Sequence, residues 1–282
     1  YGIEANDIFT FYAEEDLEKQ QEQVEKLMER GVCGLIIQAV EEAKIPGLTD
    51  QCAEKQIPVV FINSEPTKEE KQRWSEEKIA ASWVGTDGRQ AGAYQGQLIL
   101  ESPEHGDFNG DGMVSYVMIQ GDLDAEDTKN RTEYSVNTIV SSGIEVEKLG
   151  YAIANWNRAQ AQNKMTQLLS QNGNKIELVI ANNDDMAVGA IDALKASDLS
   201  REEWPVVVGI DGTNVGLEAV KNGEMVGTVY NDKEGQAKGM LELSFALATG
   251  GNLEDLNLED GKYIRMPYAK VGPDDVDEYL NR

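Results

Sequence analysis

A run of alternating oxygen donors lies near the middle of the chain, where residues 107–115 read DFNGDGMVS. This spacing matches the first part of a calcium-binding loop, with carboxylates and an amide at positions 1, 3 and 5, a glycine at the sharp turn of position 6, a backbone carbonyl at position 7 and a hydroxyl or bridging water at position 9. These positions are Asp107, Asn109, Asp111, Gly112, Met113 and Ser115. The pattern predicts calcium, and an ordinary turn rich in Asp and Asn is the alternative.

The loop lacks the carboxylate that would close it. A helix–loop–helix site has a bidentate Glu at position 12, but that position is Met118, whose thioether is no ligand for a hard cation. Residues 113–120 are rich in β-branched and aromatic side chains and predict a strand rather than a helix. A calcium ion here would therefore need a carboxylate from a distant part of the chain.

Length and charge restrict the class of protein. The chain has 282 residues, enough for about two domains. Its formal charge of −26, from 51 acidic and 25 basic residues, disfavours binding to nucleic acid or anionic lipid. The longest apolar runs are the length of strands, so no membrane span is expected. Because the chain opens at Tyr1 without a methionine, we expect a processed or truncated start.

Few residues are available for nucleophilic catalysis. His105 is the one histidine, so almost no residues are available to form a catalytic Ser/His or Cys/His pair. Cys33 and Cys52 form the one possible disulfide pair, and two reduced, buried thiols are the alternative.

Strand-like and helix-like segments alternate along the chain. The predicted strands are 8–14, 32–38, 58–63, 80–85, 113–120, 147–154, 177–182, 205–210 and 226–230, with helices after 14 and at 47–56, 88–100, 126–142, 157–171, 184–196 and 213–222. This order predicts an α/β fold built from right-handed βαβ units around parallel sheets. Ligands bind such sheets outside the carboxyl ends of the strands.

Polar side chains follow the predicted strands at that edge. They are Asn63, Asn155, Asn182, Asn183, Asp184, Asp211, Asn231 and Asp232, together with Trp156. Asp127 and Arg131 stand four apart at the start of a helix and so face the same way. A carboxylate beside a guanidinium suits the paired hydroxyls of a sugar, and an indole suits the C–H face of a pyranose.

Each of these residues also has a purely structural interpretation. Asn and Asp after a strand cap the next helix, and a cap is the preferred interpretation of Asp184. Asp127 and Arg131 could be an exposed helix pair, and Trp156 could belong to the core. We favour a ligand site because all of these residues fall at the same end of their elements.

Several segments resemble a known family in order and spacing. They are PVVFINSEP, WVGTD, DFNGDG, NWNRAQAQNKM, KIELVIANND, VVGIDG and GTVYNDKEGQAKG. Together they are similar to periplasmic sugar-binding proteins of the galactose/glucose-binding type, which are substrate-binding components of ABC importers that also serve chemotaxis. The resemblance covers essentially the whole chain.

The resemblance implies a type I periplasmic binding protein fold, in which two doubly wound parallel-sheet lobes are joined by a three-segment hinge and sugar binds in the cleft. The first lobe would comprise residues 1–85 and 233–265, and the second, with the calcium loop, residues 87–231 and 268–282. The implied location is extracytoplasmic, either the periplasm or the cell surface as a lipoprotein. The implied partners are a monosaccharide, an ABC permease and a chemoreceptor.

Carried over by position, the resemblance assigns roles to individual residues. The implied sugar contacts are Asn63, Asp127, Arg131, Trp156, Asn183, Asp211 and Asn231. Glu177 becomes the missing calcium ligand, beside Asp107, Asn109, Asp111, Met113 and Ser115. The implied activity is the binding of an aldohexose of the galactose/glucose type, without catalysis.

Two departures from the family affect this expectation. Ala125 stands where the family has a sugar-contacting histidine. The chain also starts after the family's first strand and first helix, which supply an acidic and an aromatic sugar contact. Either that segment is not included, or another chain supplies it, or segments 8–14 and 32–38 pair directly.

Other classes of protein remain as alternatives. A periplasmic sensing module of a receptor or kinase would share the fold. A glycoside hydrolase could use Asp127 and Asp211 as its carboxylates, but Arg131 beside Asp127 disfavours the role of a general acid. A transcriptional repressor core would need a DNA-binding head and a charge of the opposite sign.

Overall fold

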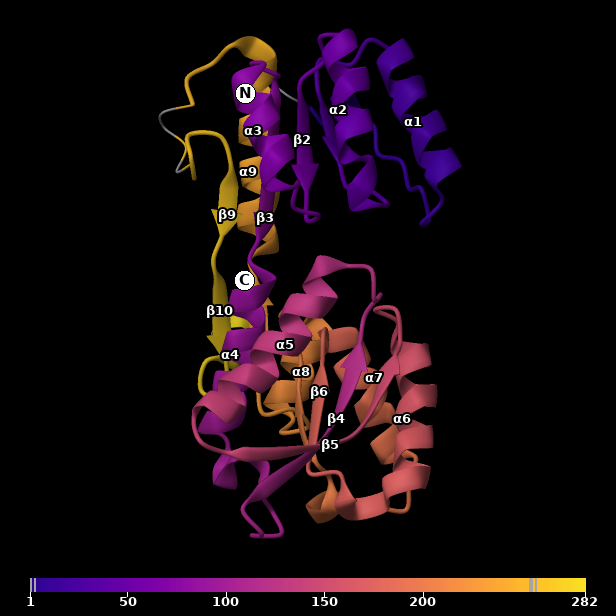
Figure 1. Cartoon of the computed structure of the whole chain (residues 1–282), viewed down its shortest axis with the longest axis vertical. Coiled ribbons are helices and arrows are strands. Elements are labelled where there is room, and N and C mark those ends of the chain that lie inside the picture. The colour runs from indigo at the N-terminus through magenta and orange to yellow at the C-terminus, as the bar shows by residue number, and fades with distance from the viewer. Residues whose placement is uncertain (1, 3, 254–255, 257) are drawn as a thin grey trace. The chain divides into compact units, whose positions relative to one another are not determined.

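A computed structural model describes residues 2, 4–253, 256 and 258–282, which divide into two units (Figure 1). Unit 1 comprises Tyr1–Thr86 and Asp232–Met266, and unit 2 comprises Asp87–Asn231 and Pro267–Arg282. The chain therefore passes between the units three times. No helix among the described residues is both long and apolar enough to cross a membrane.

Unit 1 contains one four-stranded sheet of parallel strands in the order β1-β2-β3-β9. Its elements are α1 (Leu17–Glu29), β1 (Leu35–Ile37), α2 (Ile45–Glu54), β2 (Val59–Ile62), α3 (Lys68–Glu76), β3 (Ala81–Thr86), α9 (Lys233–Thr249) and β9 (Ile264–Met266). Alternate residues of β2 serve different cores: Val59 and Phe61 pack with α1 and α2, whereas Val60 packs with Leu243 of α9. The sheet is thus covered on both faces, as parallel sheets require.

The predicted strand at 8–14 is wrong. A short 3₁₀ helix at Ala5–Asp7 precedes the segment, which itself contains no helix or strand, and no described strand pairs with it. Its β-forming side chains are therefore exposed, with Tyr12 at 76%. The suggested direct pairing of 8–14 with 32–38 is wrong for the same reason.

Unit 2 contains a four-stranded parallel sheet in the order β5-β4-β6-β7 and an antiparallel pair of β8 with β10. Its elements are α4 (Gly88–Glu101), β4 (Met113–Gln120), α5 (Glu126–Ser141), β5 (Glu145–Ile153), α6 (Arg158–Asn172), β6 (Leu178–Ala181), α7 (Asp184–Lys195), β7 (Val206–Val208), α8 (Asn214–Lys221), β8 (Thr228–Asn231), β10 (Tyr268–Val271) and α10 (Val276–Leu280). Isolated parallel bridges, such as Asp211 with Tyr230, place β8 beside the end of β7.

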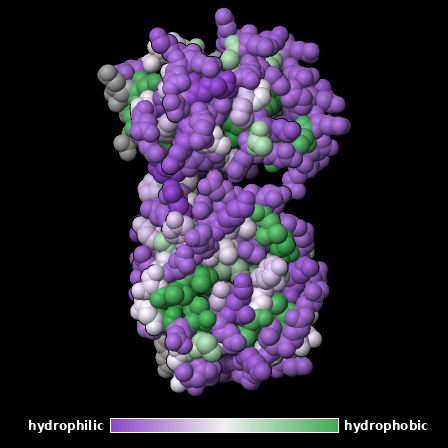
Figure 2. Space-filling view, in the orientation of Figure 1, coloured by the Kyte–Doolittle hydropathy of each residue, from purple (hydrophilic) through white to green (hydrophobic). Residues whose placement is uncertain are grey.

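The two faces of this sheet pack against different helices. Val117 and Ile119 of β4 join a core with α6, α7 and α8, whereas Met118 joins a second core with α4 and α5. Because the four strands are parallel, their carboxyl ends lie at one edge of the sheet. The visible surface of each unit is mostly hydrophilic (Figure 2), in line with a chain of 27% charged residues.

The two cysteines do not form a disulfide. Cys33 is free and exposed, and Cys52 is free and buried, where burial raises its pKa to about 12. The expectation of two buried thiols therefore holds for Cys52 and is wrong for Cys33.

Candidate functional site

The carboxyl edge of the unit 2 sheet gathers most of the residues that the sequence singles out. Asp127 and Arg131 lie on α5 after β4, Trp156 follows β5, Asn183 follows β6, Asp211 follows β7 and Asn231 ends β8. Asn63 follows β2 in unit 1, where it is exposed and its carbonyl accepts a hydrogen bond from Trp83 Nε1 at 3.2 Å.

Arg131 is the centre of the unit 2 group. Its Nη2 lies 3.2 Å from Asp127 Oδ2, one helical turn earlier, and its Nη1 lies 3.3 Å from Asp211 Oδ1. Nη1 also donates to the carbonyl of Asn182 at 2.8 Å, and Nη2 to the hydroxyl of Tyr268 at 3.1 Å. One guanidinium therefore holds carboxylates from two separate strand ends in a fixed arrangement.

The exposed fractions of these three side chains indicate different roles for the guanidinium and the carboxylates. The side chain of Arg131 is 6% exposed, whereas those of Asp127 and Asp211 are 41% and 28% exposed. The carboxylates, rather than the guanidinium, thus present most of the accessible polar surface, and Arg131 orients them. Its Nε is buried and has no hydrogen-bond partner among the described residues.

The electrostatics of the group follow from burial. Burial acts to lower the pKa of Arg131, but Tyr268, Asp127 and Asp211 outweigh it and raise that pKa, so the guanidinium stays charged. Burial raises the pKa of Asp211 to about 6; the charge of Arg131 opposes this rise, and the charge of Asp127 adds to it. Asp211 therefore changes charge close to neutral pH.

Trp156 adds a flat apolar surface. Its backbone has φ +61°, directly after Asn155 with φ +48°, so two consecutive residues adopt the left-handed conformation. The guanidinium carbon of Arg131 lies 5.6 Å from the centre of its ring. The indole is half-buried, so it is not simply a core residue.

The residue that caps α7 is Asn183 and not Asp184. Asn183 Oδ1 accepts a hydrogen bond from the backbone N–H of Met186 at 2.9 Å. Asp184 is the first residue of the helix and is fully buried, so its preferred interpretation as a cap is wrong. Asn231 lies beside Asp211, to whose carbonyl it donates its backbone N–H at 3.0 Å.

Sequence reasoning missed two residues that complete the group. Tyr268 lies 137 positions from Arg131, and no local pattern connects them. For Asn182 the sequence indicates only that it follows a strand. Its side-chain Oδ1 accepts from the N–H of Gly121 at 3.2 Å and its Nδ2 donates to Thr132 at 3.1 Å, which ties β6 to β4 and α5.

The predicted calcium loop at 107–115 runs into β4, whose first residue is Met113. Asp107 accepts hydrogen bonds from the N–H groups of Gly110 and Gly112, and Glu177 accepts from those of Asn109 at 3.2 Å and Ser115 at 2.9 Å. The side chain of Glu177 therefore reaches the loop from the start of β6. In the described part of the chain, no three His, Cys, Asp or Glu side chains form a ready-made metal cluster.

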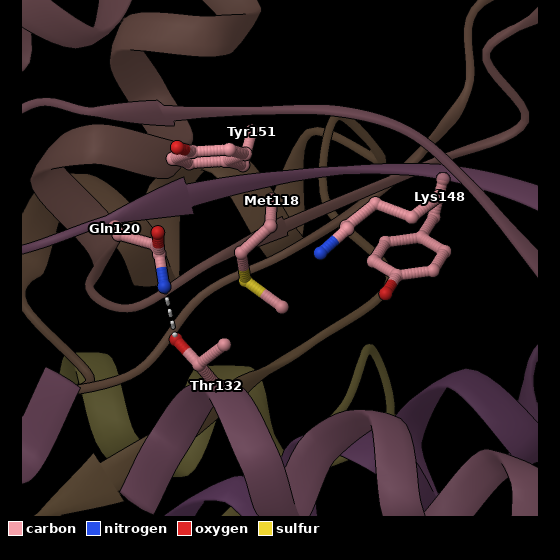
Figure 3. Close-up of a pocket in the computed structure, with 6 residues that line it drawn as sticks. Met118, Gln120, Thr132, Lys148 and Tyr151 are labelled. Atoms are coloured by element: carbon pink, nitrogen blue, oxygen red, sulfur yellow. Dashed lines mark hydrogen bonds between the residues drawn. The ribbon is translucent and has the colours of Figure 1, made fainter. Parts of the chain in front are cut away.

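One pocket lies beside β4 (Figure 3). Residues of β4, β5 and α5 line it: Tyr116, Met118, Gln120, Thr132, Lys148 and Tyr151. Gln120 Nε2 donates to Thr132 Oγ1 at 3.2 Å across one side. Its volume of about 140 Å³ is small beside the roughly 300–1,000 Å³ of typical ligand pockets, so we do not place the ligand here.

The chain belongs to the periplasmic binding protein domain family, whose model matches residues 1–252. It is 33% identical over 268 residues to the D-galactose/methyl-galactoside binding periplasmic protein MglB of Haemophilus influenzae, covering 93% of this chain and 78% of that protein. It is 32% identical over 274 residues to a putative rhizopine-binding protein of Rhizobium meliloti, covering 95% of this chain and 80% of that protein.

A solved structure of similar fold is an ABC transporter solute binding protein from Bacillus halodurans C-125 with bound myo-inositol. The TM-score is 0.77 at 27% identity, and the match covers 95% of this chain and 84% of that one.

These matches confirm the type I periplasmic binding protein fold and the resemblance to sugar-binding components of ABC importers. The protein is thus an extracytoplasmic substrate-binding protein and not an enzyme, and the hydrolase alternative is set aside.

Proposed function

We propose that this protein binds a neutral aldohexose of the galactose/glucose type and delivers it to an ABC importer. The observation that carries this proposal is the arrangement around Arg131, which holds the carboxylates of Asp127 and Asp211 at the edge of the unit 2 sheet. Carboxylate oxygens accept hydrogen bonds from vicinal hydroxyls, and Trp156 supplies an apolar surface for the C–H face of the ring.

The charge of the group restricts the ligand. Two carboxylates and one guanidinium leave an excess negative charge, which disfavours sugar acids and suits neutral polyols. Of the relatives named above, one is a D-galactose/methyl-galactoside binding protein, one is a putative rhizopine-binding protein and one has bound myo-inositol. We take galactose and glucose as the first candidates, with myo-inositol as the comparison.

The test is a calorimetric and Trp-fluorescence titration with galactose, glucose, myo-inositol and galacturonate. We expect saturable binding of a neutral sugar and weaker binding of galacturonate. Asp211→Asn should weaken binding at least tenfold. Asp192→Asn, which alters an Asp paired with Arg158 elsewhere in unit 2, should leave it within twofold. No saturable response to any neutral ligand would refute the proposal.

We also propose that the loop at 107–115 binds calcium. The donors would be the side chains of Asp107, Asn109, Asp111 and Glu177, the backbone carbonyl of Met113 and the hydroxyl of Ser115 or a water. The supporting observation is that Glu177 is 4% exposed and accepts only backbone N–H groups, with no basic side chain paired to it among the described residues. Buried carboxylates normally have a cationic partner or a metal.

Other expectations stay predictions. Asn63 belongs to unit 1, and its contact with the sugar stays a prediction. The same holds for a chemoreceptor as a second partner and for attachment to the cell surface as a lipoprotein. A sensing module rather than an importer component would bind sugar equally well, and stimulation of a reconstituted permease by the loaded protein would distinguish the two.

A further inference from the structure

Asp184 is a buried carboxyl group that the proposed binding reaction does not use. Asp184 is fully buried, and its backbone N–H donates to the carbonyl of Ile210 at 2.7 Å. Its Oδ2 accepts from the N–H of Thr213 at 2.8 Å and from its hydroxyl at 3.2 Å. Asp184 therefore contacts the chain on both sides of Asp211.

A second link reaches the same turn. Asp184 Oδ1 lies 2.6 Å from Thr228 Oγ1, which in turn accepts from the N–H of Gly212 at 3.3 Å. Every residue from 210 to 213 except Asp211 is thus bonded directly or through Thr228 to Asp184. Asp211 itself has φ +116°, a backbone conformation that non-glycine residues rarely adopt and that persists only where the surroundings impose it.

The space around the carboxyl group is shaped for it. A Cβ atom at Gly209 would lie 2.3 Å from Asp184 Oδ1, and one at Gly216 would lie 2.2 Å from Oδ2. Any side chain at either position would displace the carboxyl group. The end of β7 and the first turn of α8 therefore both accommodate Asp184.

We propose that Asp184 is a positioning residue for ligand binding, which holds the 210–213 turn so that Asp211 points its carboxylate beside Arg131. This inference rests on the proposed function, because Asp211 is assigned there as a sugar contact. Asp184 acts through Asp211.

The protonation state of Asp184 determines which substitution preserves its hydrogen bonds. Burial raises its pKa to about 8 and the charge of Asp211 adds to the rise, whereas the bonds from Thr228 and Thr213 oppose it. The carboxyl group is therefore mostly neutral at pH 7. Asparagine reproduces that form, because its amide can donate to Thr228 while its oxygen accepts from Thr213.

The experiment compares Asp184→Asn and Asp184→Leu with the unaltered chain. Galactose, glucose and myo-inositol are titrated at pH 7, and hydrogen exchange of residues 210–214 is measured without ligand. Leu168→Ala serves as the control, because it destabilises the same core from α6 and breaks none of the bonds to the turn. We expect Asp184→Leu to raise the Kd at least tenfold and to speed exchange at the turn, whereas Asp184→Asn restores both to within about threefold of the unaltered chain.

A pH series provides a readout that a purely structural role would not change. Between pH 7 and 9 the affinity of the unaltered chain should fall, because Asp184 ionises behind Asp211, which also faces Arg131, Asp127 and Asp185. Asp184→Asn should bind with constant affinity over that range. Unchanged Kd and unchanged exchange in folded Asp184→Leu would overturn the inference.

A failure of the proposed function looks different. The unaltered chain would then bind none of the three ligands. Exchange at 210–214 still decides whether Asp184 holds the turn: faster exchange in Asp184→Leu supports it, and unchanged exchange refutes it.

Discussion

The indole of Trp156 lies so close to Gly121 that a Cβ atom on residue 121 would sit 2.2 Å from the ring. Gly121 follows β4 and Trp156 follows β5, so the contact joins two neighbouring strand ends of unit 2. The orientation of the indole therefore depends on the absence of a side chain at 121.

Gly121→Ala should displace the indole and weaken sugar binding. Overpacking of this kind costs about 1–3 kcal/mol, and here the strain falls on a residue assigned to the ligand. We expect at least a tenfold rise in Kd and an altered fluorescence change on titration. Gly47→Ala in α2 is the control: outside its chain neighbours and its own helix backbone, no described heavy atom lies within 4 Å of the new Cβ, so binding should not change. Unaltered affinity in Gly121→Ala would show that Trp156 does not contact the ligand.

Arg131→Lys should weaken binding strongly although it keeps the charge. Lysine cannot reproduce the fork that reaches Asp127 and Asp211 together. Losing one partner of a buried, hydrogen-bonded charge pair costs about 2 kcal/mol or more, so we expect a Kd about 30-fold higher by calorimetry. Arg158→Lys, at a more exposed ion pair with Asp192, should bind normally. Equal affinities in the two variants would contradict the central role of Arg131.

Sugar affinity should fall as the pH is lowered from 7 to 5. Asp211 has a pKa raised to about 6, so it is charged above that pH and neutral below it. Protonation removes the charge that strengthens its hydrogen bonds to ligand hydroxyls. Asp211→Asn should bind weakly with little change over this range. A pH-independent Kd in the unaltered chain would show that Asp211 does not contact the ligand.

Through Asp184, the free energy of unfolding should fall as the pH is raised, whereas sugar affinity should fall as the pH is lowered from 7 to 5. Its folded-state pKa of about 8 lies above the ordinary value of 3.8, so between these values the folded state binds more protons than the unfolded state. Its contribution to the free energy of unfolding is therefore lost as pH rises toward 8, by at most about 1.4 kcal/mol per pH unit. The difference between the unaltered chain and Asp184→Asn in urea unfolding at pH 6, 7 and 8 measures this slope. A flat or rising difference would be inconsistent with a protonated, buried Asp184.

Chelation of calcium should lower the melting temperature. A metal at about 100 times its Kd stabilises the folded state by about 2.7 kcal/mol. Glu177→Gln should melt lower than the unaltered chain in calcium and should respond little to chelator. Glu147→Gln, at an exposed position of β5, should behave like the unaltered chain. If chelation leaves all three unchanged, the loop is an ordinary turn.

Periodicity in the sequence predicted the elements of unit 2 from α4 to β8 but not β10 or α10, and the strand at 113–120 has the predicted bounds. The prediction failed where the secondary structure of a segment depends on contacts with other parts of the chain. Residues 8–14 have strand-forming side chains, but no strand in the described part of the chain pairs with them, and local propensity cannot replace those hydrogen bonds. Helix α3 was missed because it buries few residues, chiefly Trp74 and Glu70, and shows no apolar repeat.

The group at the sheet edge was predictable in part. Parallel strands must end together, so polar residues after β4 to β8 indicated a site. The sequence could not reveal that Tyr268 joins Arg131, because 137 positions separate them. Nor could it distinguish Asn183 from Asp184 as the cap of α7, since both residue types cap helices and only burial and geometry separate them.

The cap on α7 places a hydrogen-bond donor and the two acceptor carboxylates at different positions along this edge of unit 2. One lone pair of the Asn183 side-chain oxygen accepts a hydrogen bond from the N–H of Met186, and the NH₂ group of the same amide can donate hydrogen bonds to a ligand. Asp127 and Asp211, in contrast, can only accept hydrogen bonds while they are ionised. We therefore predict that a sugar bound at this edge turns an oxygen lone pair toward the amide of Asn183 and hydroxyl hydrogens toward the two acids, and this polarity would discriminate between epimers of the same size.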